Sequence, residues 1–431
     1  MRLTVIGTGY LGATHAAAMA ELGHDVLGID IDPDKVAALA SGRVPFHEPG
    51  LDELLAKHTA SGRLRFTTSY AEAATFGQVH FVCVGTPQAT DTDSGAADLS
   101  YVNAAVDALA AHLSPGTLVV GKSTVPVGTA HRLAGRLPTG TELAWNPEFL
   151  REGFAVQDTL RPDRLVMGVA SAAAEALLRE VYAAVIATGT PVVITDLPTA
   201  ELVKTAANAF LATKISFINA MAEVCEASGG NVATLAEAIG HDNRIGSRFL
   251  RAGVGFGGGC LPKDIRAFRA RAQELGAGRA LAFLGEVDAI NLRRRQRVLD
   301  LARELCGGSV AGRRVAVLGA AFKPDSDDIR DSPALDVAAR LHRQDAQVTV
   351  FDPKAMDNAR KAYPDLEYAA TSTAVAEGAD LVVHLTEWPE FGRIDPAMLP
   401  AAGRKIIDGR GGLDPARWRA AGWTFRALGR P

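Results

Sequence analysis

Residues 3–12 read LTVIGTGYLG, and this stretch decides the fold of the first part of the chain. Residues 3–7 form a short apolar run that ends in glycine, and residues 15–22 follow with a helical pattern. Gly7, Gly9 and Gly12 allow a tight turn, close approach of a pyrophosphate and close packing of the helix on the strand. The stretch therefore predicts a strand, a glycine-rich loop and a helix that bind a dinucleotide.

Asp30 strengthens this prediction because it ends a second apolar run, residues 25–30, and lies 18 residues beyond Gly12. A carboxylate at this point accepts a hydrogen bond from the ribose 2'-hydroxyl and repels a 2'-phosphate, which favours NAD over NADP. Lys35 follows nearby and is expected to border the adenosine. A domain of this type that has lost its nucleotide is the alternative, and the complete strand, loop, helix and acid argue against it.

Further short apolar runs alternate with helical segments through the first half, at residues 79–84, 117–120, 165–169 and 192–195. Continuous apolar strands separated by helices are typical of a parallel sheet covered on both faces. Helical patterns without strands then follow, at residues 199–227, 265–273 and 280–305. We expect this helical layer to connect two sheet domains and to offer a dimer surface.

The opening pattern returns at residues 315–319, which read VAVLG, and continues with a helix at 334–342 and strands at 347–352, 379–385 and 405–408. This second copy is ten residues longer between its glycine and Asp352, and residues 323–330 lie in the insert. The fold class is therefore α/β, with two doubly wound Rossmann-like domains joined by a central helical segment. The 431 residues are divided as 1–196, 197–308 and 309–431.

Composition limits the partners. Forty-five Lys and Arg against 49 Asp and Glu give a net charge of −4, which predicts no bulk attraction to nucleic acid or an anionic membrane. No run of 18 uncharged apolar residues exists, so we expect no membrane-spanning segment. We also expect no secretory signal, because the residues before the first strand are too few to form one. The four cysteines lack CxxC spacing, so we expect no zinc or other metal site, no disulfide framework and a cytoplasmic location.

Residues 253–264 read GVGFGGGCLPKD and form the most unusual segment. Five glycines in seven positions are expected to leave backbone amides free to wrap a ligand. Pro262 suits the first turn of a helix, and a thiol at that helix start beside Lys263 should be a good nucleophile. Cys260 is therefore the candidate nucleophile, whereas Cys83, Cys225 and Cys306 are expected to be inert core residues.

Three other polar features have structural interpretations. Lys204 and Asn208 share one helix face, which is most often a solvated face, although only 10 of the 45 basic residues are lysines. Residues 146–152 read NPEFLRE and are typical of a capped helix start with Asn146 as N-cap. Residues 293–297 read RRRQR and are interpreted as a solvated helical stripe and not as a nucleic-acid patch.

These segments together resemble the UDP-glucose/GDP-mannose dehydrogenase family, and the resemblance runs from residue 1 to about residue 414. The matching segments are GTGYLG, VGTP at 84–87, ADLSYV at 97–102, STVPVGT at 123–129, NPEFLREG at 146–153, the helix of Lys204 and Asn208, RIGSRFLRAGVGFGGGCLPKD at 244–264 and GAAFKPDSDDIRDSPA at 319–334. Within the family, the RIGSRFLRAG stretch is more similar to the UDP-glucose branch than to the GDP-mannose or UDP-N-acetylhexosamine branches.

The resemblance implies a four-electron oxidation of UDP-glucose at C6 to the acid, with two NAD+ used in turn. Cys260 would trap the aldehyde as a thiohemiacetal and later hold a thioester, which suits oxidation of a carbonyl to the acid level. Lys204 and Asn208 would stabilise the developing alkoxide. Asp264 would act with a bound water as the base.

The resemblance also implies that Glu148 and Thr124 assist hydrolysis of the thioester. The implied cofactor residues are Gly7, Gly9, Tyr10, Leu11, Gly12, Asp30, Lys35, Thr86, Thr124, Glu152, Lys263 and Arg330. The implied substrate residues are Glu148, Phe149, Leu150, Arg151, Glu152, Lys204, Asn208, Phe249, Leu250, Arg251, Ala252, Gly253, Gly257, Lys323, Arg410 and, from the neighbouring subunit of a homodimer, Arg244.

Two positions depart from the family pattern, because Gly259 stands where Ser is common and Ser326 where Thr is common. Alternatives remain at this point. They are the same chemistry on GDP-mannose or a UDP-N-acetylhexosamine, a two-electron hydroxyacid dehydrogenase that does not need Cys260, and an inactive NAD-linked sensor. The presence of Lys204, Cys260 and Asp264 argues against the sensor.

Overall fold

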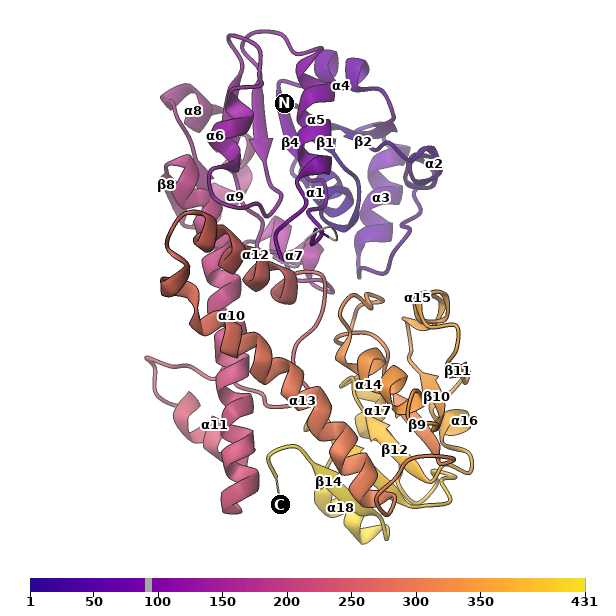
Figure 1. Cartoon of the computed structure of the whole chain (residues 1–431). Helices are drawn as coiled ribbons and strands as arrows, with labels where there is room; N and C mark the ends of the chain where they lie inside the picture. Colours follow the sequence, from indigo (N-terminus) through magenta and orange to yellow (C-terminus); the bar gives the residue numbers. More distant parts are fainter. Residues whose placement is uncertain (90–94, 431) are drawn as a thin grey trace. The chain divides into compact units, whose positions relative to one another are not determined.

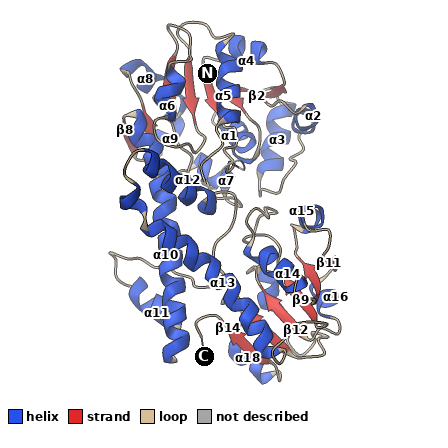
Figure 2. Ribbon diagram, viewed as in Figure 1, coloured by secondary structure: helices blue, strands red, loops and turns tan. Residues whose placement is uncertain are grey.

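The computed structural model of the chain describes residues 1–89 and 95–430. Its elements form two compact units (Figure 1), Met1–Ala207 with Ala270–Gly278, and Asn208–Arg269 with Arg279–Pro431. Strands alternate with helices at the start of the first unit and again in the last part of the second (Figure 2). Among the described residues, no helix is both long and apolar enough to cross a membrane.

The first sheet has the order β3-β2-β1-β4-β5-β6-β7-β8 and is parallel except where β6 meets β7. Its strands are β1 (Arg2–Ile6), β2 (Asp25–Ile29), β3 (Leu64–Thr67), β4 (Val79–Val82), β5 (Leu118–Gly121), β6 (Glu142–Trp145), β7 (Leu165–Gly168) and β8 (Val192–Thr195). The helices of this part are α1 (Tyr10–Glu21), α2 (Pro33–Ala40), α3 (Leu51–Ala60), α4 (Tyr70–Phe76), α5 (Ser100–Ala110), α6 (Thr129–Ala134), α7 (Ala155–Leu160), α8 (Ala172–Val181) and α9 (Ala183–Ala187).

Two apolar cores cover the two faces of this sheet. Leu3 and Val5 of β1 pack in a core with α1, α3 and α8, whereas Ile6 packs in another core with α4, α5 and α6. Successive side chains of a strand point to opposite faces, so a strand buried on both sides must be apolar throughout. This burial explains the continuous apolar runs of the sequence and confirms a doubly wound domain.

The central helices follow as α10 (Leu197–Ser228), α11 (Val232–Gly240), α12 (Leu261–Glu274), a 3-10 turn at Gly278–Leu281 and α13 (Phe283–Leu305). The second sheet has strands β9 (Arg314–Leu318), β10 (Gln347–Phe351), β11 (Glu367–Tyr368), β12 (Leu381–His384), β13 (Lys405–Asp408) and β14 (Thr424–Ala427). Its helices are α14 (Pro333–His342), α15 (Met356–Ala362), α16 (Ser372–Ala376), α17 (Pro389–Arg393) and α18 (Pro415–Ala420).

The second sheet repeats the topology of the first. Its order β11-β10-β9-β12-β13-β14 matches β3-β2-β1-β4-β5-β6 position by position. This is the strand order of doubly wound nucleotide-binding folds, in which ligands bind at the carboxyl ends of the strands. The structure thus confirms two Rossmann-like sheets joined by a helical segment, while the division at residues 196/197 and 308/309 stays a prediction.

The two copies use the acid after their second strand differently. Asp352 follows β10 as Asp30 follows β2, but Asp352 is 1% exposed and its carboxylate is surrounded by protein donors. These donors are the amides of Ala320 (2.7 Å), Ala321, Lys354 and Ala355 (2.9 Å each) and the indole Nε1 of Trp388 (3.0 Å). Asp352 therefore binds the amides that follow Gly319, and its carboxylate has no position left for a ribose hydroxyl.

We expect Asp352→Asn to lower the free energy of unfolding by about 2–3 kcal/mol, because an amide nitrogen would face donors that now bind a charged acceptor. Urea unfolding followed by circular dichroism measures the change. Asp357→Asn is the control, since the Asp357 side chain is 88% exposed. Equal losses in the two variants would contradict the structural role of Asp352.

Candidate active site

The loop between β1 and α1 has the geometry that a dinucleotide requires. Gly7 has φ +85°, and a Cβ placed on it would lie 2.6 Å from Val84 Cγ1. A Cβ on Gly12 would lie 1.8 Å from the carbonyl oxygen of Gly7, so the helix packs against the turn without room for a side chain. A Cβ on Gly9 would meet no atom within 4 Å. The space at Gly9, before the helix amides, is where a pyrophosphate fits.

Asp30 lies at the end of β2 with 6% exposure, and its carboxylate accepts hydrogen bonds from Thr8 N (2.9 Å) and Thr8 Oγ1 (3.1 Å). Lys35 Nζ lies 3.1 Å from the same carboxylate. Burial raises the pKa of Asp30, but the hydrogen bonds from Lys35, Asp32 and Thr8 outweigh burial and leave it below its usual value. An ionised carboxylate next to the glycine loop fits a ribose with a 2'-hydroxyl.

Glu48, which the sequence analysis did not single out, connects Tyr10 of the glycine loop to the segment that follows Glu148. Its hydroxyl donates a short hydrogen bond to the buried Glu48 carboxylate, which also accepts from Gly153 N (2.7 Å) and Ala155 N (2.8 Å). No pattern in the sequence indicates Glu48, because its three partners come from two segments remote in the chain. Leu11, next to Tyr10, packs on the core that α1 and α3 share.

The loops after β4 and β5 meet through two predicted site residues. Thr86 is 5% exposed, and its Oγ1 donates to the carbonyl oxygen of Thr124 at 2.8 Å. Ser123, beside Thr124, donates to Val84 O at 2.7 Å. The structure therefore brings VGTP and STVPVGT together at the carboxyl end of the first sheet.

The prediction of a capped helix start at Asn146 is wrong. No helix covers residues 146–154, and α7 begins at Ala155. The Asn146 side chain is buried and bonds other partners: Oδ1 accepts from Lys122 Nζ (3.0 Å) and the Tyr182 hydroxyl (2.6 Å), and Nδ2 donates to Val166 O (2.8 Å). Tertiary hydrogen bonds thus replace the local cap.

Glu148 is held on both carboxylate oxygens. Oε1 accepts from the amides of Phe149 (2.7 Å) and Leu150 (3.0 Å), and Oε2 lies 3.0 Å from Lys122 Nζ. Sequence reasoning missed Lys122, although a lysine that directly follows an apolar strand in a lysine-poor chain is a signal in retrospect.

Two cations lie near the ring of Phe149, a predicted residue of this segment: the predicted Lys204, and Arg164, which was not predicted. Arg164 Cζ lies 3.9 Å and Lys204 Nζ lies 5.5 Å from the centroid of the Phe149 ring. Cations at these distances are attracted to the face of the ring. Arg151 is turned outward and pairs with Asp158 at 2.7 Å, while Glu152 is half-buried.

The second unit brings Asn208, Lys263 and Asp264 together. Asp264 is 2% exposed, and its two oxygens accept from Asn208 Nδ2 and Lys263 Nζ, both at 2.6 Å. The expectation of a solvated face does not hold for Asn208, which is 6% exposed. Cys260 is exposed directly before α12, and Pro262 lies in the first helical turn as predicted.

The other three cysteines are buried, as expected, and none of the four, all within the described residues, forms a disulfide. Burial raises the pKa of Cys83 to about 12 and also raises the pKa of Cys306. These thiols stay protonated at neutral pH and are poor nucleophiles.

The prediction that the glycine-rich loop leaves its amides for a ligand is wrong for much of the loop. Amides bind protein acceptors at Gly253 (Asn219 Oδ1, 2.8 Å), Val254 (Gly409 O, 2.7 Å), Phe256 (Asn291 Oδ1, 2.7 Å) and Gly258 (Arg330 O, 2.8 Å). A Cβ on Gly255 would lie 2.3 Å from Asn291 Oδ1, and one on Gly257 would lie 2.3 Å from Asp331 O. These two glycines are required because the Asn291 side chain packs directly against Gly255 and the main chain of Asp331 packs directly against Gly257.

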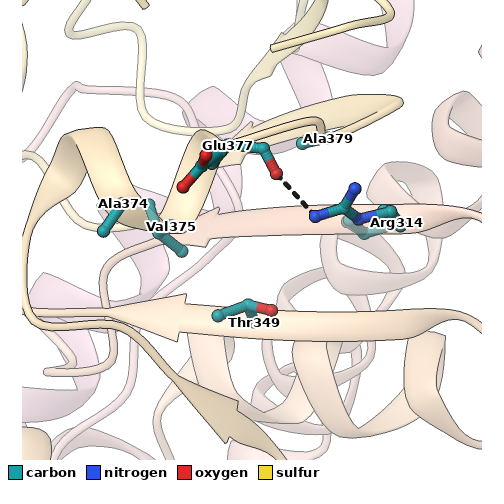
Figure 3. Close-up of a pocket in the computed structure, with 7 residues that line it drawn as sticks. Arg314, Thr349, Ala374, Val375, Glu377 and Ala379 are labelled. Carbon is teal, nitrogen blue, oxygen red and sulfur yellow. Dashed lines mark hydrogen bonds between the residues drawn. The ribbon is translucent and has the colours of Figure 1, made fainter. Parts of the chain in front are cut away.

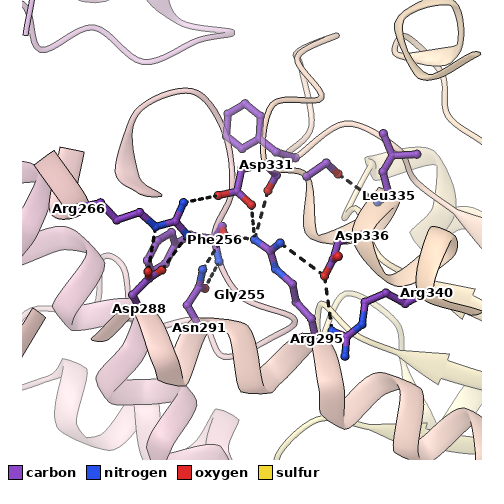
Figure 4. Close-up of polar contacts among 12 residues, drawn as sticks. Gly255, Phe256, Arg266, Asp288, Asn291, Arg295, Asp331, Leu335, Asp336 and Arg340 are labelled. Carbon is purple, nitrogen blue, oxygen red and sulfur yellow. Dashed lines mark hydrogen bonds and ion pairs between the residues drawn. The ribbon is translucent and has the colours of Figure 1, made fainter. Parts of the chain in front are cut away.

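Figure 4 shows the polar contacts behind this loop. Asn291 of α13 binds both the amide and the carbonyl of Phe256, at 2.7 and 3.0 Å. Asp331 accepts from Arg295 at 2.8 Å and lies 3.7 Å from Arg266. Arg294 and Arg295 are 0% and 4% exposed, so the solvated-stripe prediction is wrong for these two arginines, which pair with the half-buried carboxylates of Glu226 and Asp331.

Arg330 lies against Gly259 and accounts for the departure at that position. A Cβ on Gly259 would lie 2.2 Å from Arg330 Cζ, so the guanidinium fills the space of a side chain. Arg330 also pairs with Asp328 at 2.6 Å. Nothing in the structure explains the Ser326 departure.

Arg410 has its guanidinium in the protein interior. It donates to the carbonyl oxygens of Leu385 (2.8 Å), Gly255 (2.9 Å) and Phe322 (2.9 Å), and lies 3.2 Å from Glu387. It therefore joins β12, the glycine-rich loop and the loop of Lys323. Lys323 Nζ lies 5.5 Å from the Phe322 ring centroid.

The stretch before the glycine-rich loop is more open. Phe249 is 41% exposed with φ +64°, Leu250 is buried, and Arg251 is exposed. Ala252, which directly precedes Gly253, is half-buried. Arg244 is 89% exposed and pairs with Asp242 at 2.6 Å.

A small pocket of about 120 Å³ lies elsewhere in the second unit (Figure 3), lined by Arg314, Val315, Thr349, Ala374, Val375, Glu377 and Ala379. Arg314 donates to Glu377 O at 2.8 Å across it. The pocket contains none of the predicted site residues.

A dinucleotide loop with an ionised acid in one unit, and an exposed thiol near a buried carboxylate in the other, are typical of an NAD-linked dehydrogenase. Residues 1–186 match the NAD binding domain of the UDP-glucose/GDP-mannose dehydrogenase family, 198–293 its central domain and 316–415 its UDP binding domain. The chain belongs to this family and is an NAD-dependent oxidoreductase.

Relatives of full length are similar to this chain. It is 41% identical to the UDP-glucose 6-dehydrogenase of Rhizobium meliloti over 100% of both chains, and 40% identical to that of Pseudomonas aeruginosa over 100% and 98%. The structure of a UDP-glucose dehydrogenase from Pyrobaculum islandicum matches with TM-score 0.91, 38% identity and coverage of 100% and 98%. A UDP-D-ManNAc dehydrogenase from Pyrococcus horikoshii matches at 28% identity and TM-score 0.86, over 100% and 99%.

We expect Gly12→Ala to destabilise the protein by about 1–3 kcal/mol, because its Cβ overlaps Gly7 O. Gly9→Ala should change stability by less than about 0.5 kcal/mol but weaken NAD+ binding, because its Cβ enters open space that the pyrophosphate needs. Urea unfolding and titration calorimetry with NAD+ measure both variants. NAD+ binding by Gly9→Ala as tight as in the wild type would contradict the placement of the pyrophosphate.

Proposed function

We propose that this dehydrogenase oxidises UDP-glucose at C6 to UDP-glucuronate through a thioester on Cys260. The observation that carries the proposal is the exposed Cys260 thiol at the start of α12, one turn before Asp264, whose carboxylate Asn208 and Lys263 hold. A two-electron oxidation of an alcohol does not need a nucleophile, whereas oxidation of the resulting aldehyde to an acid benefits from a covalent adduct.

The residues of the first unit fit NAD+. Gly7, Gly9 and Gly12 would hold the pyrophosphate at the start of α1, and the ionised Asp30 would accept from the adenosine ribose. When bound, NAD+ supplies the hydride acceptor for each of the two oxidations. Tyr10, Leu11, Lys35, Thr86, Thr124, Glu152, Lys263 and Arg330 are the further residues proposed to border it.

The chain's own groups handle the sugar. Loss of the C6 hydroxyl proton and a hydride gives an aldehyde, and Lys204 with Asn208 stabilises the alkoxide that forms first. Cys260 sulfur then adds to the aldehyde carbon and gives a thiohemiacetal. Loss of a second hydride and a proton leaves the thioester. Asp264, whose carboxylate lies 2.6 Å from Lys263 Nζ, receives the hydroxyl proton through a water.

Hydrolysis completes the reaction. A water oxygen bonds to the acyl carbon, the C–S bond breaks with its electron pair on sulfur, and the acid is released. Glu148 and Thr124 assist by orienting this water. The overall change consumes one UDP-glucose, two NAD+ and one water, and yields UDP-glucuronate, two NADH and three protons.

The nucleotide-sugar is assigned to the open stretch and the loops around it. Phe249, Leu250, Arg251, Ala252, Gly253 and Gly257 are proposed to wrap it, with Glu148, Phe149, Leu150, Arg151, Glu152, Lys204, Asn208, Lys323 and Arg410 completing the site. Because Arg410 is bonded to three carbonyls, we propose that it acts on the sugar mainly by fixing the surrounding loops. UDP-glucose is favoured over a UDP-N-acetylhexosamine because relatives named for UDP-glucose reach 41% identity against 28%.

We expect the purified protein to release two NADH per UDP-glucose consumed, measured by absorbance and by product quantification. GDP-mannose and UDP-N-acetylglucosamine should give little NADH. Cys260→Ser should abolish acid formation, because an alkoxide is a poorer leaving group than a thiolate. One NADH per sugar would make the Cys260 role wrong, and full turnover by Cys260→Ser would favour a two-electron hydroxyacid dehydrogenase.

We further propose a homodimer formed through α10. Phe210, Phe217 and Val224 recur every seven residues and are 66%, 50% and 56% exposed, an apolar stripe that a second copy would cover. The exposed Arg244 would then reach the partner's substrate. The cytoplasmic location rests on the reduced cysteines and stays a prediction.

Phe217→Asp should weaken self-association by about 100-fold or more, because an unpaired carboxylate in an apolar interface costs several kcal/mol. Light scattering coupled to gel filtration measures the mass. Met398→Asp is the control, since Met398 is 77% exposed and lies outside the stripe. A wild-type monomer, or an unchanged dimer in Phe217→Asp, would rule out this interface.

A further inference from the structure

Lys122, to which the proposed function assigns no role, lies in the interior of the first unit. Lys122 directly follows β5 and its side chain is 4% exposed. Moving an ammonium from water into a protein interior costs several kcal/mol unless it is paired and hydrogen-bonded. Its presence there therefore points to an interaction that needs the charge.

The Lys122 ammonium has a partner for each of its donors. Nζ lies 3.0 Å from Glu148 Oε2, 3.0 Å from Asn146 Oδ1 and 3.4 Å from the Tyr182 hydroxyl. The Asn146 amide is fixed in turn by Val166 O, so the whole group has one arrangement. An ammonium has three donors and no acceptor, and this site satisfies them.

Three titratable groups around Lys122 carry no charge at neutral pH. Burial raises the pKa of Cys83 and of Tyr182 to about 12, and burial holds the pKa of His15 well below its usual value, so all three are neutral at pH 7. Burial lowers the pKa of Lys122, but the Glu148 carboxylate outweighs burial and leaves the pKa above its usual value. Glu148 is therefore the anion that balances Lys122.

The same contacts fix the Glu148 carboxylate. Lys122 holds Oε2, and the amides of Phe149 and Leu150 hold Oε1, so the carboxylate plane cannot turn. The Glu148 side chain is still 16% exposed, which leaves part of it accessible to water. A fixed, ionised carboxylate accepts a hydrogen bond from a water, whereas a protonated one would donate instead.

We propose that Lys122 is a positioning residue for thioester hydrolysis, because it holds the Glu148 carboxylate in one orientation. The inference rests on the proposed function, in which Glu148 orients the attacking water. Lys122 itself touches neither the acyl group nor the water. Its loss slows the step in which the C–O bond forms and the C–S bond breaks, and leaves the two hydride transfers as they are.

The test uses Lys122→Met, which keeps length and removes charge, with Lys122→Gln as a second variant if Lys122→Met does not fold. After rapid mixing with NAD+ and UDP-glucose, we expect a fast phase of two NADH per active site, then a steady state slower by about 10-fold or more than the wild type. Intact-protein mass spectrometry of acid-quenched samples should show the UDP-glucuronyl adduct on Cys260.

Tyr182→Phe is the matched control, because it removes a hydroxyl from the same cluster and leaves the charge pair in place. It should show no adduct. In a Glu148→Gln background, adding Lys122→Met should slow hydrolysis no further, since the lysine acts through the missing carboxylate.

The outcomes separate the two proposals. Two NADH per sugar in the wild type, with no adduct in the Lys122 variants, would overturn the role of Lys122 alone. Equal behaviour of Tyr182→Phe and Lys122→Met would show a structural role only. Fewer than two NADH in the wild type would overturn the proposed function and, with it, the hydrolytic role assigned to Lys122.

Discussion

Direct contact of main chain with main chain, possible only through glycine, is the constraint on which both candidate halves of the site depend. Gly12 lets the first turn of α1 rest on the carbonyl of Gly7, and this contact sets the helix amides at the edge of the first sheet. In the second unit, Gly257 rests on the carbonyl of Asp331 in the same way, in the loop that leads to Cys260. Gly255 of the same loop leaves room for the Asn291 side-chain oxygen. A methyl group at these positions would displace the groups that follow.

Ion pairs fix the orientation of three carboxylates among the candidate site residues. Asp30 with Lys35, Glu148 with Lys122 and Asp264 with Lys263 each join a carboxylate to a lysine. Such pairs add little to stability, because desolvation offsets most of the Coulomb attraction. What they provide is a defined orientation of each carboxylate, which a reaction that moves protons and hydrides requires.

The two sheets show how one topology serves two purposes. Both have the same strand order, and both place an aspartate after the second strand. Asp30 is surrounded by two Thr8 donors and a lysine at the protein surface, whereas Asp352 is enclosed by four amides and an indole. These donors close the ribose position of the second copy, whose longer loop holds the segment containing Lys323 and Arg330.

Sequence by itself determined the two doubly wound sheets, the glycine loop with Asp30 and the burial of the three cysteines other than Cys260. These features depend on local periodicity and on residues close in the chain, where turn, helix start and strand end have readable requirements. The tertiary structure decided the pairing of Asn208 with Asp264, of Lys122 with Glu148 and of Tyr10 with Glu48. It also overturned the cap at Asn146 and the open amides of the glycine-rich loop, because a polar group in the interior bonds whichever partner the fold brings to it, however far away in the sequence that partner lies.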